Sequence, residues 1–170
     1  MIGFLSRLFS RGEPAFAEAR PRDAAAIAAI HGVSFQRGWG EDEIYRLLAE
    51  KNVVAHRATI GASGRKVIGF ILSRLAAGEA EILSVAIAPA WRGRKLARPL
   101  LDLHLRRLAG LGTRAVFLEV GESNAPAMRL YRRAGFREVG KRQGYYQGQS
   151  SHQGNANGGA TALVMRRDIG

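Results

Sequence analysis

Residues 82–101 read ILSVAIAPAWRGRKLARPLL, and the fold depends on this segment. Its apolar run from Ile82 to Ile87 is typical of a buried strand, which Pro89 ends. A turn rich in glycine and arginine follows and leads directly into an amphipathic helix, expected at residues 94–110. Because the N-terminus of a helix offers free N–H groups and the positive end of a dipole, this arrangement suits a phosphate group. The alternative is an ordinary strand-to-helix connection whose arginines are solvated.

The rest of the chain alternates between strand and helix patterns. Short apolar runs bounded by glycine or proline predict strands, and apolar residues three or four apart predict helices. The expected strands are residues 15–21, 52–60, 66–75, 79–87, 115–120, 136–142 and 160–168. A first helix is expected to begin near Asp23 and to end at a glycine-rich loop at residues 31–40. Three further helices are expected at residues 40–50, 94–110 and 123–135. This order predicts an α+β domain with a mixed, mostly antiparallel sheet and helices on both faces.

Length and composition indicate a single globular domain without a metal. A chain of 170 residues lies within the roughly 100–200 residues of a typical domain. We place the domain at residues 16–170, after an N-terminal extension at residues 1–15. The lack of cysteine excludes disulfides, a thiolate zinc site and a cysteine nucleophile, and the four histidines show no metal-ligand spacing. No apolar run approaches the ~20 residues of a membrane-spanning helix and no secretory signal is recognisable, so we expect a cytoplasmic protein.

The charge balance points to an anionic partner. The 26 Lys and Arg against 14 Asp and Glu leave a formal net charge of +12. A basic surface can indicate nucleic-acid binding, but the sequence contains no zinc-finger spacing, RNP signature or basic zipper. A small polyanionic ligand explains the surplus equally well.

The turn after the apolar strand resembles the acetyl-CoA signature of the GNAT superfamily (GCN5-related N-acetyltransferases), Q/R-x-x-G-x-G/A. In this register Arg92, Lys95 and Ala97 occupy the three fixed positions, so a lysine stands where the family has its central glycine. Glycine lets the backbone approach a pyrophosphate closely. A lysine there must either strain the turn or swing its ammonium group toward the phosphates. The resemblance implies that acetyl-CoA is bound by Arg92, Gly93, Arg94, Lys95, Leu96 and Ala97.

A second stretch narrows the resemblance. Residues 117–146, FLEVGESNAPAMRLYRRAGFREVGKRQGYY, resemble the ribosomal-protein alanine N-acetyltransferases, the RimI type within the superfamily. Residues 19–48, ARPRDAAAIAAIHGVSFQRGWGEDEIYRLL, match the opening helices of the same group. The resemblance covers about residues 16–148 and implies the GNAT fold.

Glu119 and Tyr131 are the candidate catalytic residues. Glu119 lies on a predicted strand and points to the opposite face of the sheet from Leu118 and Val120, so its carboxylate is either solvated or enclosed at a site. Tyr131 lies on a predicted helix, where a tyrosine ordinarily packs in the core with its hydroxyl tethered. The resemblance implies that Glu119 deprotonates the incoming amine, directly or through water. It implies that Tyr131 protonates the departing thiolate.

The resemblance also implies binding roles. Backbone groups of Val85, Ala86 and Ile87 would hydrogen-bond the pantetheine arm and the thioester carbonyl, where the strand at 79–87 splays from its neighbour at a bulge. Asn124 would contact the pantetheine or the amine, although it also suits the N-cap of a helix. Tyr131 counts among the cofactor-binding residues as well. The candidate acceptor-binding residues, otherwise packing aromatics or a solvated edge carboxylate, are Phe35, Trp39, Glu81, Tyr145 and Tyr146.

We therefore expect an enzyme that transfers an acetyl group from acetyl-CoA to a protein N-terminal α-amine, with a ribosomal protein as acceptor. Its basic surface is also a candidate for weak contact with RNA. Two alternatives remain open. One is a GNAT enzyme acting on a small amine or an internal lysine. The other is a non-catalytic basic binding module on a degenerate GNAT scaffold, motivated by Lys95 and the charge, which predicts RNA binding that falls steeply with salt.

Overall fold

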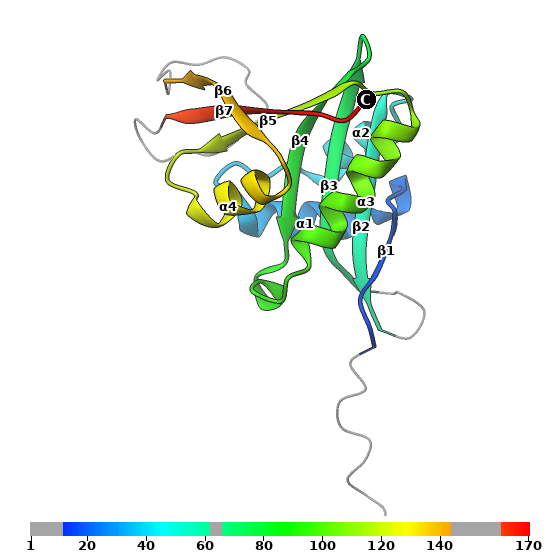
Figure 1. Ribbon diagram of the computed structural model, residues 1–170. Coiled ribbons are helices and arrows are strands. Elements are labelled where there is room, and N and C mark those ends of the chain that lie inside the picture. The colour runs from blue at the N-terminus through cyan, green and yellow to red at the C-terminus, as the bar shows by residue number, and fades with distance from the viewer. Residues whose placement is uncertain (1–11, 62–65, 144–160) are drawn as a thin grey trace, which may run out of the picture.

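One mixed sheet organises the chain (Figure 1). The computed structural model describes residues 12–61, 66–143 and 161–170. The strands are β1 Ala15–Glu18, β2 Val53–Ile60, β3 Lys66–Ala76, β4 Glu79–Ile87, β5 Ala115–Gly121, β6 Arg137–Arg142 and β7 Ala162–Asp168. The helices are α1 Ala24–Ser34, α2 Glu41–Ala49, α3 Ala97–Gly110 and α4 Ala125–Arg133, with 3₁₀ turns at Pro21–Asp23 and Pro89–Trp91. Among the described residues the strand order is β1-β2-β3-β4-β5-β7-β6, antiparallel except for β4 and β5.

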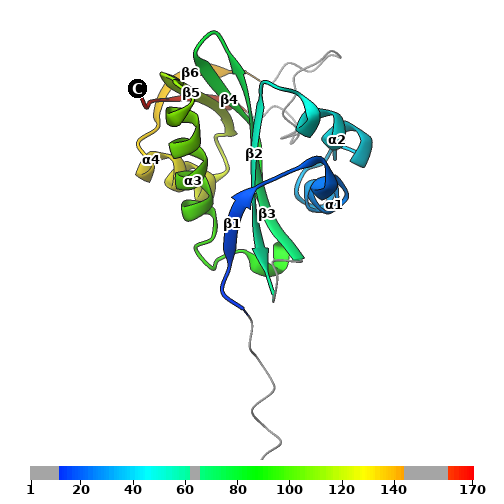
Figure 2. The same ribbon diagram turned by 90° about the vertical axis from the view of Figure 1, so that its right-hand side faces the viewer.

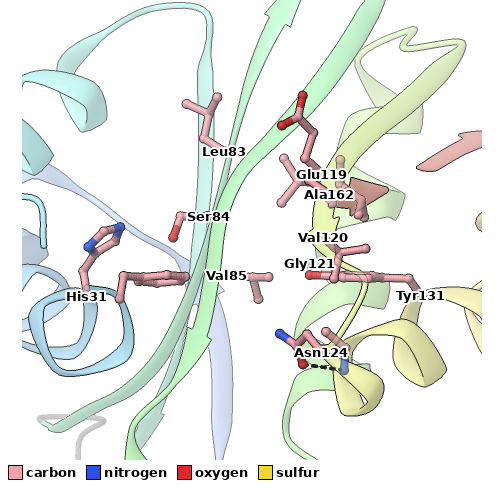
Figure 3. Close-up of a pocket in the computed structure, with 14 residues that line it drawn as sticks. His31, Leu83, Ser84, Val85, Glu119, Val120, Gly121, Asn124, Tyr131 and Ala162 are labelled. Carbon is pink, nitrogen blue, oxygen red and sulfur yellow. Dashed lines mark hydrogen bonds between the residues drawn. The ribbon is translucent and has the colours of Figure 1, made fainter. Parts of the chain in front are cut away.

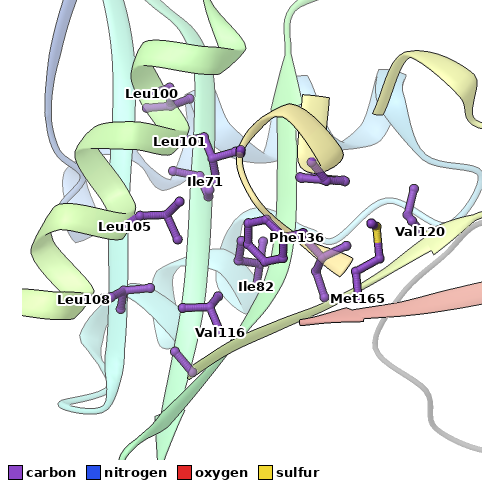
Figure 4. Packing of buried hydrophobic residues seen from close by; sticks show 14 of the residues in the cluster. Ile71, Ile82, Leu100, Leu101, Leu105, Leu108, Val116, Val120, Phe136 and Met165 are labelled. Atoms are coloured by element: carbon purple, nitrogen blue, oxygen red, sulfur yellow. The ribbon is translucent and has the colours of Figure 1, made fainter. Parts of the chain in front are cut away.

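The helices cover both faces of the sheet, as the sequence predicted. Figure 2 shows α1 and α2 on one face and α3 and α4 on the other. Each face has its own buried apolar cluster. The α3–α4 cluster contains Ile71, Ile82, Leu100, Leu105, Val116, Leu118 and Phe136 (Figure 4). The α1–α2 cluster contains Ile27, Ile30, Ile44, Leu47, Phe70, Leu72 and Leu83. The two clusters fix two helical layers independently against one sheet.

Strands β4 and β5 are paired over only half of their length. Their parallel register runs from Glu79↔Ala115 to Ile82↔Leu118 and ends there. On its other side β4 stays paired with β3 as far as Ile87. The register with β3 shifts where β4 accommodates one extra residue, Leu83. A bulge of this kind bends a strand and increases its twist. The parting of β4 from β5 therefore begins at the bulge, as the family resemblance implied.

Three predicted boundaries were wrong by a few residues. Helix α1 continues to Ser34, so the glycine-rich loop is shorter than predicted. Strand β1 ends at Glu18 because the chain turns into the 3₁₀ segment that begins at Pro21. Helix α3 begins at Ala97 and not at residue 94, because Lys95 has a φ of 59°, which a right-handed helix does not allow. None of the described helices is long and apolar enough to cross a membrane.

A polar network is buried between α3 and the sheet. His104 on α3 is fully buried, its Nδ1 lies 2.8 Å from Nδ1 of His56 on β2, and its Nε2 lies 2.7 Å from Oγ of Ser73 on β3. Burial, and secondly the neighbouring His56, lowers the pKa of His104 to about 3. Burial also lowers the pKa of His56. Both rings are therefore neutral at neutral pH, and the folded state resists their protonation.

This network predicts a loss of stability in acid. The unfolded chain takes up a proton on His104 near its ordinary pKa of about 6.5, whereas the folded protein does so only near pH 3. Stability is therefore complete above the unfolded pKa and lost as the pH falls. The free energy of unfolding should drop by about 1.4 kcal/mol per pH unit for this residue between pH 6 and 4. Urea unfolding at several pH values measures this slope.

A glutamine at position 104 serves as the control, because its amide hydrogen-bonds but does not titrate. His104→Gln should reduce the slope of the free energy of unfolding against pH by about 1.4 kcal/mol per pH unit, the contribution of one proton. It should also lower stability at pH 8, where the native network is intact. An unchanged slope in this variant would contradict the assignment of the acid sensitivity to the network.

Candidate active site

The parting of β4 from β5 leaves backbone groups of β4 free. Successive residues of a strand turn their N–H and C=O groups alternately to the two neighbouring strands. Between Leu83 and Ile87 one side is taken by β3, and no residue of β5 pairs with the other. Val85, Ala86 and Ile87 lie on this unpaired edge, where the sequence analysis placed them. An extended ligand with amide groups, such as a pantetheine arm, can pair with such an edge.

A cavity of about 140 Å³ lies in the opening between the two strands (Figure 3). From α1 and the residue after it the cavity is lined by His31 and Phe35, and from α4 and the residue before it by Tyr131 and Asn124. Because α1 and α4 cover opposite faces, the cavity connects the two faces of the sheet. The wall residues supplied by the two strands include Leu83, Ser84, Val85, Glu119, Val120 and Gly121. Two substrates can therefore meet here from opposite sides.

Glu119 lies on the α1–α2 face of the opening. It alternates with the buried Leu118, which belongs to the α3–α4 cluster, and so points away from that cluster as predicted. Its side chain is 16% exposed, and its Oε1 lies 2.9 Å from Nε of Arg142 on β6. The Arg142 side chain is itself 65% exposed, so solvent screens this pair and it can rearrange at little cost. An incoming ammonium group would find an accessible carboxylate at this position.

Tyr131 enters the opening from the α3–α4 face. The residue is buried on α4, and its ring packs edge-on against Phe136 with 5.8 Å between the centroids. In Figure 3 its hydroxyl points across the opening toward Val85. Burial raises the pKa of Tyr131 above its ordinary value, so the phenol carries its proton at neutral pH. The protonated phenol thus lines the cavity on the face opposite to that of Glu119.

Asn124 serves the helix and the cavity together. Its side-chain oxygen accepts a hydrogen bond from the Ala127 backbone N–H at 3.2 Å, which makes it the N-cap of α4. The residue also lines the cavity, and Figure 3 shows its amide nitrogen turned toward β4. Both interpretations of the sequence are compatible with this placement.

The turn between β4 and α3 has the features of a phosphate cradle. Arg92 anchors it, since its Nε donates to the Ile87 carbonyl at 3.0 Å and its guanidinium donates to Ser34 Oγ at 3.1 Å. Gly93 and Lys95 both have positive φ, 73° and 59°. Lys95 is thus the residue that has taken the glycine conformation of the signature. No side chain caps the N-terminus of α3, so its first N–H groups remain available.

The Lys95 side chain is exposed and has no ion pair within the part of the chain that the structure describes. Its backbone conformation costs about 1–2 kcal/mol for an L-residue. Strained positions of this kind cluster at ligand sites. The remaining members of the turn are Arg94, whose guanidinium lies 4.6 Å from the centroid of the Trp91 ring, and the buried Leu96 before Ala97.

The predicted acceptor residues are distributed unevenly. Phe35 lines the cavity between the strands. Glu81 is exposed on β4 and lines a second cavity of about 340 Å³, which shares Leu118 and Glu119 with the first. Trp39 lies behind the first cavity, where its ring stacks on His31 at 4.5 Å. Tyr145 and Tyr146 lie outside the described residues.

Two polar residues that line the cavity, His31 and Ser84, were not predicted from the sequence. Each is a polar residue at a position where the sequence pattern predicts burial. His31 follows Ile27 and Ile30 on the buried stripe of a helix, and Ser84 interrupts an otherwise apolar strand. A polar residue at a buried position requires a partner, which makes such an interruption informative. Arg142 was also missed, because its contact with Glu119 joins strands that the sequence does not place side by side.

A mixed sheet that parts at a bulge, with a carboxylate lining the opening on one face and a phenol on the other, is the arrangement of an N-acetyltransferase. Comparison with known proteins agrees. The acetyltransferase (GNAT) family matches residues 24–136, and the chain belongs to that family. It is an acetyl-CoA-dependent N-acetyltransferase.

Two relatives are similar in sequence over most of their length. A putative [ribosomal protein bS18]-alanine N-acetyltransferase of Bacillus subtilis is 30% identical over 86% of this chain and 89% of its own. N-alpha-acetyltransferase RimI of Mycobacterium tuberculosis is 36% identical over 68% of each chain.

Solved structures share the fold at lower identity. The ribosomal-protein-S18-alanine N-acetyltransferase from Escherichia coli superposes with a TM-score of 0.78 at 24% identity, over 92% of this chain and 94% of its own. Arabidopsis thaliana NAA60 in complex with acetyl-CoA gives a TM-score of 0.76 at 20% identity, over 92% and 99%. These likenesses confirm the predicted fold.

Two substitutions at Lys95 separate its charge from its backbone strain. Lys95→Gly removes both, whereas Lys95→Gln keeps the positive φ and removes only the charge. If the ammonium group contacts the phosphates, both variants should bind CoA about 5-fold more weakly at low salt, the effect of roughly 1 kcal/mol. Only Lys95→Gly should gain thermal stability. Titration calorimetry and thermal unfolding measure the two effects, and CoA affinity equal to wild type in Lys95→Gln would disprove the contact.

Proposed function

We propose that this enzyme acetylates the α-amine of a protein N-terminus that begins with a small residue. The observation that carries the proposal is the cavity that connects the two faces of the sheet between Glu119 and Tyr131. The names of the relatives support a ribosomal-protein acceptor with an N-terminal alanine. Modification of a ribosomal protein also favours action in the cytoplasm.

Acetyl-CoA is the substrate of the α3–α4 face. Its phosphates fit the turn Arg92–Ala97 at the start of α3, and its pantetheine arm fits the unpaired edge of β4. A backbone N–H among Val85, Ala86 and Ile87 is then available to the thioester oxygen. One such donor contributes roughly 3–4 kcal/mol to acyl transfer when it meets the developing negative charge.

The acceptor amine approaches from the α1–α2 face. Glu119 takes its proton, directly or through a water molecule, and the amine nitrogen forms the new C–N bond. The C–S bond of the thioester breaks, and the Tyr131 hydroxyl supplies the proton that the thiolate needs. An α-amine has an ordinary pKa of about 7.7–8.0 against about 10.4 for lysine, so a carboxylate base serves an N-terminus more readily.

The acceptor groove extends beyond the first residue. The second cavity continues from Glu119 along β4 and β5, where Glu81 stands beside Phe117. An extended peptide advances about 3.4 Å per residue, so this surface accommodates several acceptor residues. A small amine would leave it unused, which favours a peptide acceptor. Phe35 and Glu81 remain our candidates for contact with that peptide, together with Trp39, Tyr145 and Tyr146.

The basic surface favours an additional weak contact with RNA. Arg129 and Arg132 on α4 are exposed and have no ion pair within the described part of the chain. Arginines that neutralise phosphates release counterions, so RNA affinity should fall steeply between 50 mM and 200 mM salt. Acetylation of a free peptide should not follow that salt dependence. Comparing the two salt dependences therefore separates binding to RNA from acetyl transfer.

Acetylation of a basic peptide that starts with alanine tests the proposed function. Glu119→Gln should lower kcat/KM about 100-fold or more, because the base is lost. Tyr131→Phe should lower it by a comparable factor through slower departure of the thiolate. Free CoA is the readout, and mass spectrometry locates the acetyl group.

Matched controls are Glu138→Gln and Tyr45→Phe, which make the same chemical changes at exposed positions outside the cavities. Both should retain wild-type rates. Acetylation of lysine side chains or polyamines in preference to the α-amine would refute the proposed acceptor. Full activity in Glu119→Gln would refute the assignment of the base.

A further inference from the structure

Ser84 carries a buried hydroxyl without a partner. The residue is 7% exposed, and its Oγ makes no hydrogen bond within the described part of the chain. It is the first residue of β4 after the bulge at Leu83, and it lines the cavity between the strands. An unpaired buried hydroxyl costs about 1–3 kcal/mol. A serine kept in this position points to a ligand group that completes its hydrogen bonding.

His31 places a second polar group in the same cavity. It is 3% exposed, and its Nδ1 accepts a hydrogen bond from the Trp39 backbone N–H at 3.0 Å. The rings of Phe35 and Trp39 lie 4.4 Å and 4.5 Å from its own and fix its orientation. Burial lowers the pKa of His31 to about 4, so the ring is neutral at pH 7. With Nδ1 accepting, the single ring proton is on Nε2, which makes His31 a hydrogen-bond donor rather than a base.

Both groups lie on the acceptor side of the opening. Figure 3 shows the His31 ring and the Ser84 hydroxyl on the same side of β4, while Val85 points the opposite way, toward Tyr131. Glu119 lines the same cavity from β5. An acceptor whose amine reaches Glu119 therefore enters the cavity that Ser84 and His31 also line. The two substrates share a cavity of about 140 Å³, so a small side chain suits it best.

We propose that Ser84 recognises the hydroxyl group of an N-terminal serine, and that the enzyme acetylates serine in preference to alanine at this position. The inference rests on the proposed function and specifies its acceptor. A serine hydroxyl both accepts and donates, so it pairs with Ser84 Oγ and accepts from the Nε2–H of His31. An alanine methyl group fits the space but leaves Ser84 unpaired. A lysine ammonium only donates and cannot accept from His31.

The expected selectivity follows from what it costs to leave the Ser84 hydroxyl without a partner when the acceptor begins with alanine. A site built to hydrogen-bond a substrate hydroxyl discriminates against an analogue that lacks it more strongly than an apolar pocket rejects an added hydroxyl. We expect kcat/KM for a serine peptide to exceed that for the matched alanine peptide about 10-fold. The two peptides differ only in the first residue, so contacts further along the groove cancel in the ratio.

The test measures this ratio in wild type, Ser84→Ala and Thr113→Val. Ser84→Ala should reduce the serine-to-alanine ratio about 10-fold, to near 1. Thr113→Val is the matched control, because Thr113 also has a buried hydroxyl without a partner but does not line either cavity. It should leave the ratio unchanged. Urea unfolding should show neither variant to be less stable than wild type, since each loses an unpaired polar group.

The outcomes separate the two proposals. Acetylation of the alanine peptide alone, or a ratio that Ser84→Ala leaves unchanged, would overturn the role of Ser84 and leave the proposed function standing. An equal loss on both peptides in Ser84→Ala would assign the hydroxyl to the peptide backbone, which also overturns the inference. If neither peptide is acetylated by an enzyme that binds CoA, the proposed function and the inference both fall.

Discussion

The parting of β4 from β5 after Ile82 and Leu118 is the constraint on which the site depends. Two parallel strands in one sheet ordinarily satisfy each other's backbone groups along their whole length. Here one extra residue at Leu83 bends β4 away, and the groups of the following residues have no β5 partner. An unpaired edge of this kind offers its N–H and C=O groups to a ligand. The defect in the sheet therefore becomes a binding surface.

Two separate apolar clusters, one on each face of the sheet, hold the parted strands in place. The sheet is held rigid from one face by α3 and α4 and from the other by α1 and α2, so the gap stays open between two packed layers. Tyr131 is positioned by the first layer and His31 by the second. Each substrate thus contacts side chains that are held by a different helical layer. Holding the two reactants in one fixed opening supplies the entropic part of catalysis.

Much of this architecture could be predicted from the sequence, because the spacing of apolar residues and the positions of glycine and proline indicate local structure. The apolar period placed the helices and the sheet, and the Asn124–Pro126 start of α4 followed from capping rules. For Lys95 the sequence left two alternatives, a strained turn or an ammonium group turned toward the phosphates, and its φ of 59° shows the strained turn. The bulge at Leu83 could not be predicted, because a one-residue shift of register depends on which strands pair. Ser84 and His31 depend on that register, so their meeting in one cavity could not be inferred.

Hydrogen exchange along β4, with and without CoA, tests the central claim most directly. The account predicts that the amides between Leu83 and Ile87 that face away from β3 gain protection when CoA binds, because the ligand pairs with the free edge. Amides from Glu79 to Ile82, where β4 is already paired with a strand on both sides, should not change. Protection confined to the paired half of β4, or none in β4 at CoA concentrations that saturate the protein, would contradict the account.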